Sequence, residues 1–458
     1  RLYTENNAGA IVELGTNPAT EITANAGIAL PDSQKATFGA GDDLQIYHDG
    51  SNSFIDDAGT GNLQIRGTQI KLQKYTGENM FVGISDGAAS VYYDNAQKLA
   101  TTATGIDVTG ISVSDGMSTN TLGTSNFIAG VNAGNSIESG GNFNVLVGDE
   151  AGTAITTGDN NVAVGYAALD ANTTGTSNIA VGQSALSNNT TGGSLVAVGN
   201  GALLANTTGV YNVGIGYQSL KSNTTGDKNV AVGYQSLKSN TTADYNTAFG
   251  DQALESNTTG ASNTAVGSNA LVSNTTGAEN TAVGIEALRN NTTGTPNNAF
   301  GRQALRSNST GGSNCAFGEQ ALQSNTTASN NTAFGHQALT ANTTGATNTV
   351  VGSLAMSTNT TGDQNTVSGH QALKSNTTGS ANVVMGLNTM YYNTTGSSNV
   401  ALGRDALQSN TTASNNTAVG TGALFANTTG AQNTSIGQGS LAACTTAGSN
   451  NAFGHNAL

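Results

Sequence analysis

The stretch NTAFGDQALESNTTGAS, residues 246–262, is followed without a break by NTAVGSNALVSNTTGAE, residues 263–279. Units of this kind, each seventeen residues long, fill the chain from residue 144 to residue 458 in nineteen copies, the last one partial. We number the positions of the unit 1 to 17 from its first Asn. A fixed period of this length is typical of a solenoid, in which each unit buries its apolar side chains by stacking on its neighbours. The repeat therefore predicts an all-β protein built as a parallel β-solenoid, or β-roll, of about nineteen coils.

Four positions keep the same residue in nearly all copies, and each predicts a structural role. Position 5 is always Gly, which indicates a backbone angle that is costly for other residues or a close approach of two backbones. Position 9 is Leu or Met in all but one copy, and positions 1 and 12 are almost always Asn. We expect the Asn side chains to form ladders in which each one bonds to its copy in the next coil. Representative repeat residues are Gly165, Val164, Leu169, Asn172, Gly250, Phe249, Leu254, Asn257, Gly335, Phe334, Leu339 and Asn342.

The size of the side chains suggests a cross-section for the coil. Position 4 is large and apolar in nearly every copy, so positions 4 and 2 are expected to point inward, where position 4 meets the Leu of position 9. Position 3, on the opposite face of the strand, is usually Ala, and we expect this stripe of small residues to face outward as a contact between chains. For positions 6 to 11 the pattern leaves open a second strand or a single helical turn.

The chain divides into three zones by pattern. Residues 1–120 lack the repeat and are expected to form a small β-rich domain, because short alternating apolar runs are bounded there by Gly, Asp and Asn. The predicted strands are 44–47, 63–66, 70–73, 80–84 and 90–93. Residues 121–143 form a transition and capping coil, in which 126–130 resemble the first strand of the repeat but lie eighteen residues before Asn144. Residues 144–458 form the solenoid.

Composition bears on the partners of the chain. Only 9% of the residues are charged, 36% are hydrophobic, and the net charge is −14. An acidic chain repels phosphate groups, so we expect neither nucleic acid nor an anionic membrane as a partner. Each coil offers about three sizeable apolar side chains, which hardly offset the entropy of ordering seventeen residues. We therefore expect the chain to associate with itself in a closed symmetric ring; a homotrimer is the usual solution for fibres, but the sequence does not determine the symmetry order.

Three segments of the N-terminal zone carry a family resemblance: Asp42 to Ser53, Gly59 to Gly67 and Lys98 to Gly110. They resemble tail fibres and related structural proteins of marine phages, especially those of cyanobacteria, and the match covers most of residues 38–111. The seventeen-residue unit is similar to repeats of phage tail-fibre proteins and, more distantly, to the β-roll heads of trimeric autotransporter adhesins, whose repeat is shorter.

The resemblance implies a homotrimeric tail-fibre shaft located on a virion. Such a shaft would bind other tail or baseplate proteins and would carry a distal tip, outside this segment, that attaches to a host receptor. Two alternatives remain open from the residues: a bacterial trimeric surface adhesin or extracellular filament and, more remotely, an ice-binding solenoid with Thr173, Thr190, Thr207 and Thr224 as a hydroxyl array.

The search for catalytic chemistry yields no site, so the sequence predicts no enzyme, no catalytic residue, no cofactor and no metal. The four histidines, His48, His336, His370 and His455, are scattered along the chain, and we interpret them as solvated residues. The acidic residues between Asp42 and Asp57 do not have the spacing of a calcium loop and are interpreted as turn residues. The Asn-Thr-Thr triplets match the glycosylation acceptor pattern, but we expect them to serve the repeat structure instead.

A few copies place an apolar residue where Lys, Ser or Gln is usual. These departures are the candidates for surface contact with a receptor, although drift in a redundant rod also explains them. They are Leu204, Val272, Tyr391, Tyr392 and Phe425.

Overall fold

The computed structural model describes residues 2–5, 11–14, 30–103, 106–108 and 121–458. The described residues form β-strands and turns without a helix, which confirms the predicted all-β class, and so none of them makes a helix that could span a bilayer. The chain forms two units, Arg1–Asp115 and Gly116–Leu458. Each unit is described by itself.

The described residues of the N-terminal unit form three antiparallel sheets, which follow one another in the sequence. In the first, β1 (Leu2–Glu5) pairs with β2 (Ile11–Leu14). The second has the order β3-β4-β5, with bounds Lys35–Phe38, Leu44–His48 and Ser53–Asp57. The third is a meander of β6 (Gln69–Gln73), β7 (Asn79–Ile84), β8 (Ala89–Tyr93), β9 (Ala96–Thr101) and β10 (Ile106–Val108).

Four of the five strands predicted in this unit are confirmed as β4, β6, β7 and β8. The prediction of a strand at residues 63–66 is wrong, because this segment pairs with no neighbouring strand. Leu63 and Ile65 are 45% and 61% exposed. An alternating pattern needs a partner ladder and a surface to cover before it becomes a strand, and this segment has neither.

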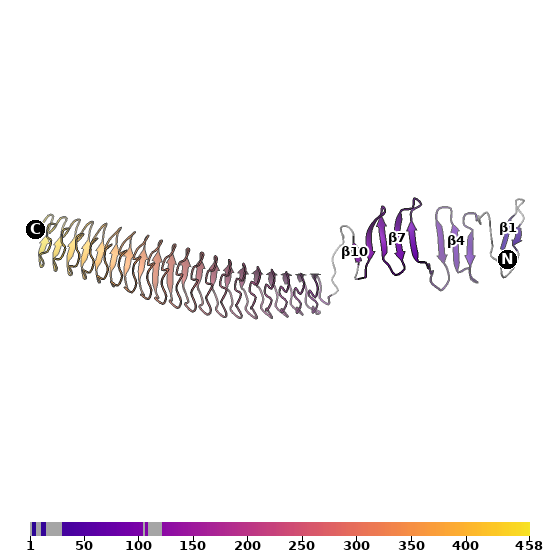
Figure 1. Cartoon of the computed structure of the whole chain (residues 1–458), viewed down its shortest axis with the longest axis horizontal. Helices are drawn as coiled ribbons and strands as arrows, with labels where there is room; N and C mark the ends of the chain where they lie inside the picture. Colours follow the sequence, from indigo (N-terminus) through magenta and orange to yellow (C-terminus); the bar gives the residue numbers. More distant parts are fainter. Residues whose placement is uncertain (1, 6–10, 15–29, 104–105, 109–120) are drawn as a thin grey trace. The chain divides into compact units, whose positions relative to one another are not determined.

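The second unit is a parallel solenoid whose twenty strands form one sheet along the side of the rod (Figure 1). Each strand pairs with the equivalent residues of the next coil, as in Val162 with Ile179. The first pair, Phe127 with Val145, spans eighteen residues, which confirms that residues 126–130 begin the repeat. The strands are β11 (Phe127–Ala129), β12 (Val145–Val147), β13 (Val162–Val164), β14 (Ile179–Val181), β15 (Val196–Val198), β16 (Val213–Ile215), β17 (Val230–Val232), β18 (Thr247–Phe249), β19 (Thr264–Val266), β20 (Thr281–Val283), β21 (Asn297–Phe300), β22 (Asn314–Phe317), β23 (Thr332–Phe334), β24 (Thr349–Val351), β25 (Thr366–Ser368), β26 (Val383–Met385), β27 (Val400–Leu402), β28 (Thr417–Val419), β29 (Thr434–Ile436) and β30 (Asn451–Phe453).

The interior of the coil is lined by positions 3, 8 and 9. Ala248, Ala253 and Leu254 are fully buried, as are their equivalents in most coils. The predicted burial of position 9, at Leu169, Leu254 and Leu339, is therefore confirmed. The predicted orientation of the strand is wrong: position 3 points inward, whereas Val164 is half-buried and Phe249 and Phe334 are 55% and 44% exposed.

The narrow lumen explains why the small residue lies inside. A Cβ added to Gly214, at position 3, would lie 3.2 Å from Cγ of Leu203, so the Leu of position 9 leaves room there for a small side chain, which is Ala in most coils and Val in three. The first full coil shows the converse, because Leu146 occupies position 3 where position 9 is Gly152, and a Cβ there would lie 2.8 Å from Leu146. The space inside one coil is therefore shared between positions 3 and 9.

Position 5 must be Gly for both of the predicted reasons. Gly165, Gly250 and Gly335 have φ angles of 132°, 143° and 137°, a region that favours glycine. A Cβ at Gly250 would also lie 2.6 Å from the carbonyl oxygen of Gly267 in the next coil. At position 15 the φ angle is not positive, so Ala243 and Ala328 are accommodated there.

Both Asn ladders are confirmed, and nearly all of their Asn residues are fully buried. Asn263 donates from its backbone N and from Nδ2 to Oδ1 of Asn246, at 3.0 and 3.2 Å. Asn274 donates from Nδ2 to Oδ1 of Asn257 at 2.8 Å. The two ladders meet at the carbonyl of Gly277, which accepts from Asn263 and Asn274 at 2.9 and 2.8 Å. Asn172, Asn257 and Asn342 are fully buried, so the Asn of these triplets serves the coil, as predicted, and the folded chain does not present it to a glycosylating enzyme.

The segment at positions 6 to 11 is neither a strand nor a helical turn. Gln252 and Leu254, at positions 7 and 9, both have φ of 54°, the left-handed conformation, whereas Ala253 between them does not have a positive φ. The backbone N of Leu254 donates to the carbonyl of Ala270 in the next coil, whereas that of Gln252 donates to Tyr234 in the preceding coil. Hydrogen bonds between coils thus continue around the turn, which satisfies backbone groups that a regular element would otherwise pair.

Candidate interaction surface

The outer face of the solenoid sheet consists of positions 2 and 4 of β11–β30. We call these residues the outer strand face. Because side chains alternate along a strand, burying position 3 places positions 2 and 4 on the opposite side. Position 2 is Val, Ile or Thr in most coils, and position 4 is apolar in every coil except that of Ser368. Phe249, Val266 and Met385 are among its exposed side chains, at 55%, 37% and 56%.

No charged residue lies on the outer strand face. Every Asp, Glu, Lys, Arg and His of residues 144–458 falls at position 6, 7, 10, 16 or 17 of the unit. The charges therefore lie on the turns that border the sheet, and the sheet itself presents along position 4 an apolar stripe that only Ser368 interrupts in residues 144–458. Large exposed apolar surfaces bordered by polar residues mark interaction sites in soluble proteins.

The middle of the outer strand face carries a ladder of aromatic rings. Phe300, Phe317 and Phe334 stack with centroid separations of 4.4 and 4.5 Å and nearly parallel planes. Cys315, at position 2 of β22, lies within this segment and is half-buried. Stacking covers the faces of the inner ring and leaves edges outward, so this ladder suits the packing of another protein surface better than the stacking of a flat ligand.

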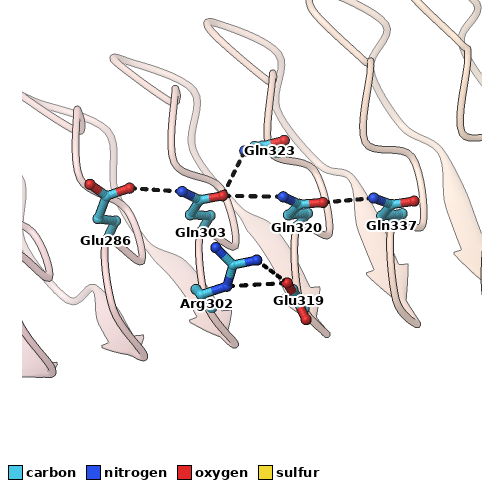
Figure 2. A network of polar contacts seen from close by, with 7 residues as sticks. All are labelled: Glu286, Arg302, Gln303, Glu319, Gln320, Gln323 and Gln337. Carbon is cyan, nitrogen blue, oxygen red and sulfur yellow. Dashed lines mark hydrogen bonds and ion pairs between the residues drawn. The ribbon is translucent and has the colours of Figure 1, made fainter.

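A second row of side chains runs along position 7, beside the charged residues of positions 6 and 10. Figure 2 shows Glu286, Gln303, Gln320 and Gln337 as one row, in which each Gln donates from Nε2 to the residue before it at 2.9, 3.2 and 2.7 Å. The hydrogen bond from Gln303, followed by the charges of Arg306 and Arg289, lowers the pKa of Glu286.

An ion pair lies next to this row. Arg302 pairs with Glu319 of the next coil, and this contact lowers the pKa of the Glu319 carboxyl (Figure 2). These groups satisfy one another between coils, which favours a structural role over a catalytic one.

The five apolar residues predicted as surface contacts do not form one patch. Leu204, Val272, Tyr391 and Phe425 all occupy position 10, and Tyr392 occupies position 11. Tyr392 and Phe425 are exposed at 53% and 41%, whereas the other three are half-buried. Val272 lies four coils from Leu204 and seven from Tyr391, which by strand spacing is about 19 and 34 Å. Tyr391 packs instead against Tyr392 and accepts a hydrogen bond from Lys374 at 3.1 Å.

The histidines and the acidic residue Asp49 do not form a binding site. His48, His336, His370 and His455 are exposed, and the described residues contain no group of three or more His, Cys, Asp or Glu able to hold a metal ion. Oδ1 of Asp49 accepts hydrogen bonds from the backbone N of Asn52 and Ser51 at 2.7 and 2.8 Å, which lowers its pKa and identifies it as a turn residue.

The Thr residues considered for ice binding have their hydroxyls occupied within the coil. The hydroxyl of Thr173 donates to the carbonyl of Thr190 at 3.1 Å, and Thr190, Thr207 and Thr224 donate in the same way to the next coil. They also lie at a bend and not on a strand.

Sequence reasoning missed the outer strand face. Positions 2, 3 and 4 are all free of charge, so the charge pattern could not tell the inside of the strand from the outside. The signal that could have found it is the exchange of volume between positions 3 and 9 in the first full coil, where Leu146 accompanies Gly152. Positions that compensate one another in size share one space.

Comparison with known proteins identifies no relative of this chain. No protein-family model, no curated protein and no solved structure matches the chain. What the fold defines is a class of architecture: an all-β protein whose larger unit is a parallel β-solenoid of about nineteen seventeen-residue turns.

Proposed function

We propose that this chain is a structural fibre protein of a virion, a homotrimeric tail-fibre shaft that holds a host-attachment tip away from the particle and contributes to adhesion to the host surface. The observation that carries the proposal is the uninterrupted ladder of twenty parallel strands. At a strand spacing of about 4.8 Å, this ladder makes a rod of roughly 90 Å.

The use of polar groups supports a mechanical role. The Asn side chains of positions 1 and 12 bond from coil to coil inside the rod, and the Thr hydroxyls of position 13 bond to the next backbone. Together with the outward Gln row, these contacts connect neighbouring coils and leave no convergent set of reactive side chains among the described residues. We therefore propose a protein without catalytic activity, whose partners are further copies of itself, other tail proteins and, through the tip, a host receptor.

Deletion of two whole units, residues 246–279, tests the shaft proposal. The register of the remaining coils is kept, so the fibre should become about 10 Å shorter while adsorption to the host stays largely intact. Deletion of residues 246–253 is the matched control, because removing part of a unit breaks the register and should prevent assembly. Complete loss of adsorption by fibres that assemble normally after the two-unit deletion would contradict the shaft proposal.

Location separates the virion proposal from a bacterial surface adhesin or filament with the same coil. An antibody raised against the repeat should label thin fibres on the tails of purified particles in negative-stain images. Labelling of a bacterial envelope in the absence of particles would favour the adhesin instead.

A further inference from the structure

The outer strand face is the one long side of the coil that the single chain leaves apolar and uncovered. Ile215, Phe249, Val351 and Met385 on this face are 38% to 56% exposed, while position 3 of the same strands is almost fully buried. Full burial of an exposed side chain of this kind contributes about 1.5 to 3 kcal/mol, and these half-buried side chains leave roughly half of that to be gained. Covering the outer strand face with another surface of the same length would therefore be favourable.

The size of the face suits a stable protein interface. Each strand contributes a strip about 4.8 Å long and roughly 10 Å wide, so twenty strands present on the order of 1,000 Å² per chain. A standard interface buries about 800 Å² per partner, so the face is large enough by itself. Its apolar centre and its borders of Tyr and charged residues, such as Tyr217, Tyr234 and Arg302, match the core and rim of such interfaces.

A second copy of the same chain is the partner that fits this face along its whole length. An apolar stripe with one residue pair per coil needs a partner with the same spacing of coils, and an identical rod has it. The contact buries no charged side chain, because the charges of residues 144–458 lie outside positions 2 and 4. A rod that is attached at one end also requires its copies to run in the same direction, which a rotation axis along the rod provides.

We propose that copies of this chain pack outer strand face to outer strand face, parallel and in register, about an axis that runs along the rod. The assignment rests on the self-associating fibre proposed above and deepens it by naming the interface. The rings of Phe300, Phe317 and Phe334 would then meet their own copies at the same level of each chain. The stripe of Ala at position 3, which lies inside the coil, takes no part in the contact.

The two native cysteines provide a test on the unaltered chain. Cys315 lies on the outer strand face at β22, and Cys444 occupies position 12 near the end of the rod. In a parallel, in-register assembly the Cys315 residues of different copies lie at the same level. In an antiparallel assembly Cys315 would lie level with Thr264 of β19, which is three coils, or about 14 Å, from the Cys315 of the other copy.

The purified protein is treated with the short thiol crosslinker bismaleimidoethane and run on a denaturing gel. We expect linked chains in the wild type and in Cys444→Ser, and their loss in Cys315→Ser. An oligomer, detected by native mass spectrometry, whose Cys315 residues cannot be linked would overturn the assignment and leave the shaft proposal standing. A wild-type chain that is monomeric throughout would overturn both this assignment and the trimer in the proposed function.

A charge placed on the face gives an independent readout. The double variant Phe249→Lys and Val266→Lys should weaken association at least tenfold in analytical ultracentrifugation, since it buries lysines among apolar groups. The matched control is Thr259→Lys with Thr276→Lys, at the exposed position 14 of the same coils, which should keep the wild-type mass. Circular dichroism checks that both variants fold. An unchanged dissociation constant in the face variant would contradict the proposed interface.

Discussion

The two units of the chain use similar alternating strands but differ in how much side-chain surface they bury. In the solenoid, residues at positions 3, 8 and 9 and both Asn ladders are buried in coil after coil. In residues 30–103 and 106–108, the described part of the N-terminal unit that carries burial data, only Val82, Ser90 and Ala100 are buried. Ile55, Leu72 and Tyr93 are more than half exposed there.

The difference in burial arises because the chain of the solenoid winds into coils, which cover one face of each strand. An antiparallel meander such as β6–β10 is a single layer, and both of its faces need another surface to cover them. In the solenoid, each coil returns over its own strand and brings the Leu of position 9 against position 3. One face of every strand is thus covered within the chain, and only the outer strand face is left for a partner.

The largest expected effect comes from a side chain at position 5. In Gly250→Ala, the new Cβ meets the Gly267 backbone and the φ of 143° is unfavourable for Ala, so we expect a loss of about 3 kcal/mol or more from the coils around it. The matched change in the N-terminal unit is Gly77→Ala, where φ is 87° and no atom lies within 4 Å of the added Cβ. It should cost only about 1 kcal/mol. Hydrogen exchange of the neighbouring amides measures both; equal losses would mean that the close approach of coils is unimportant.

Truncation of an apolar side chain is expected to have the second-largest effect, with a larger loss of stability in the solenoid than in the N-terminal unit. Leu254→Ala removes a fully buried side chain and is expected to cost about 2 to 5 kcal/mol. Leu72→Ala, in which the Leu is 57% exposed, should change stability by less than about 0.5 kcal/mol in the isolated chain. Thermal melts followed by circular dichroism provide the comparison. A larger loss for Leu72→Ala in the assembled protein than in the isolated chain would mean that association covers the N-terminal sheets too.

Breaking an Asn ladder should have a smaller effect than core truncation. Asn257→Ala removes the donor to the carbonyl of Gly260 and to Oδ1 of Asn240, and one of the two acceptors of Nδ2 of Asn274, at a cost of about 1 to 3 kcal/mol. Asn79→Ala, which removes one of the two acceptors of Gln73 Nε2 on the exposed surface of the other unit, should cost about 0.5 kcal/mol, because water replaces the lost acceptor. Urea denaturation measures the two variants, and an Asn257→Ala loss as small as that of Asn79→Ala would argue against a structural ladder.

The smallest expected effect concerns protonation. Glu286 has a lowered pKa because Gln303 of the next coil donates to it, whereas the pKa of Asp49 is lowered by backbone groups of its own turn. A lowered pKa in the folded state adds stability that is present above the unfolded value of about 4.3 for Glu and is lost as the pH falls through the folded value.

Removing the donor tests this dependence on the neighbouring coil. Gln303→Met should therefore raise the pKa of Glu286 and leave that of Asp49 unchanged in a carboxyl-carbon NMR titration. A Glu286 pKa that stays low would assign the effect to Arg306 and Arg289 alone.

Much of the solenoid could be predicted from the sequence because its repeat is local and regular. The period, the burial of Leu254, the Gly at position 5 and the buried Asn ladders all follow from residues that recur every seventeen positions. The segment around Leu63 was predicted wrongly, because a strand depends on a neighbour that its own residues do not specify. The role of the five apolar departures at positions 10 and 11 in receptor contact stays a prediction, and their distances along the rod show that they do not make one site.

The sequence by itself determined that the chain stacks in parallel coils and which residues hold one coil to the next, because identical residues at a constant interval can pair only with their own copies. Only the tertiary structure decided which face of each strand lies inside. Alternation divides a strand into two faces without saying which is buried, and size misleads when the lumen is narrow. The Leu of position 9 fills that lumen, so Ala takes the inside and Val and Phe form the outer strand face.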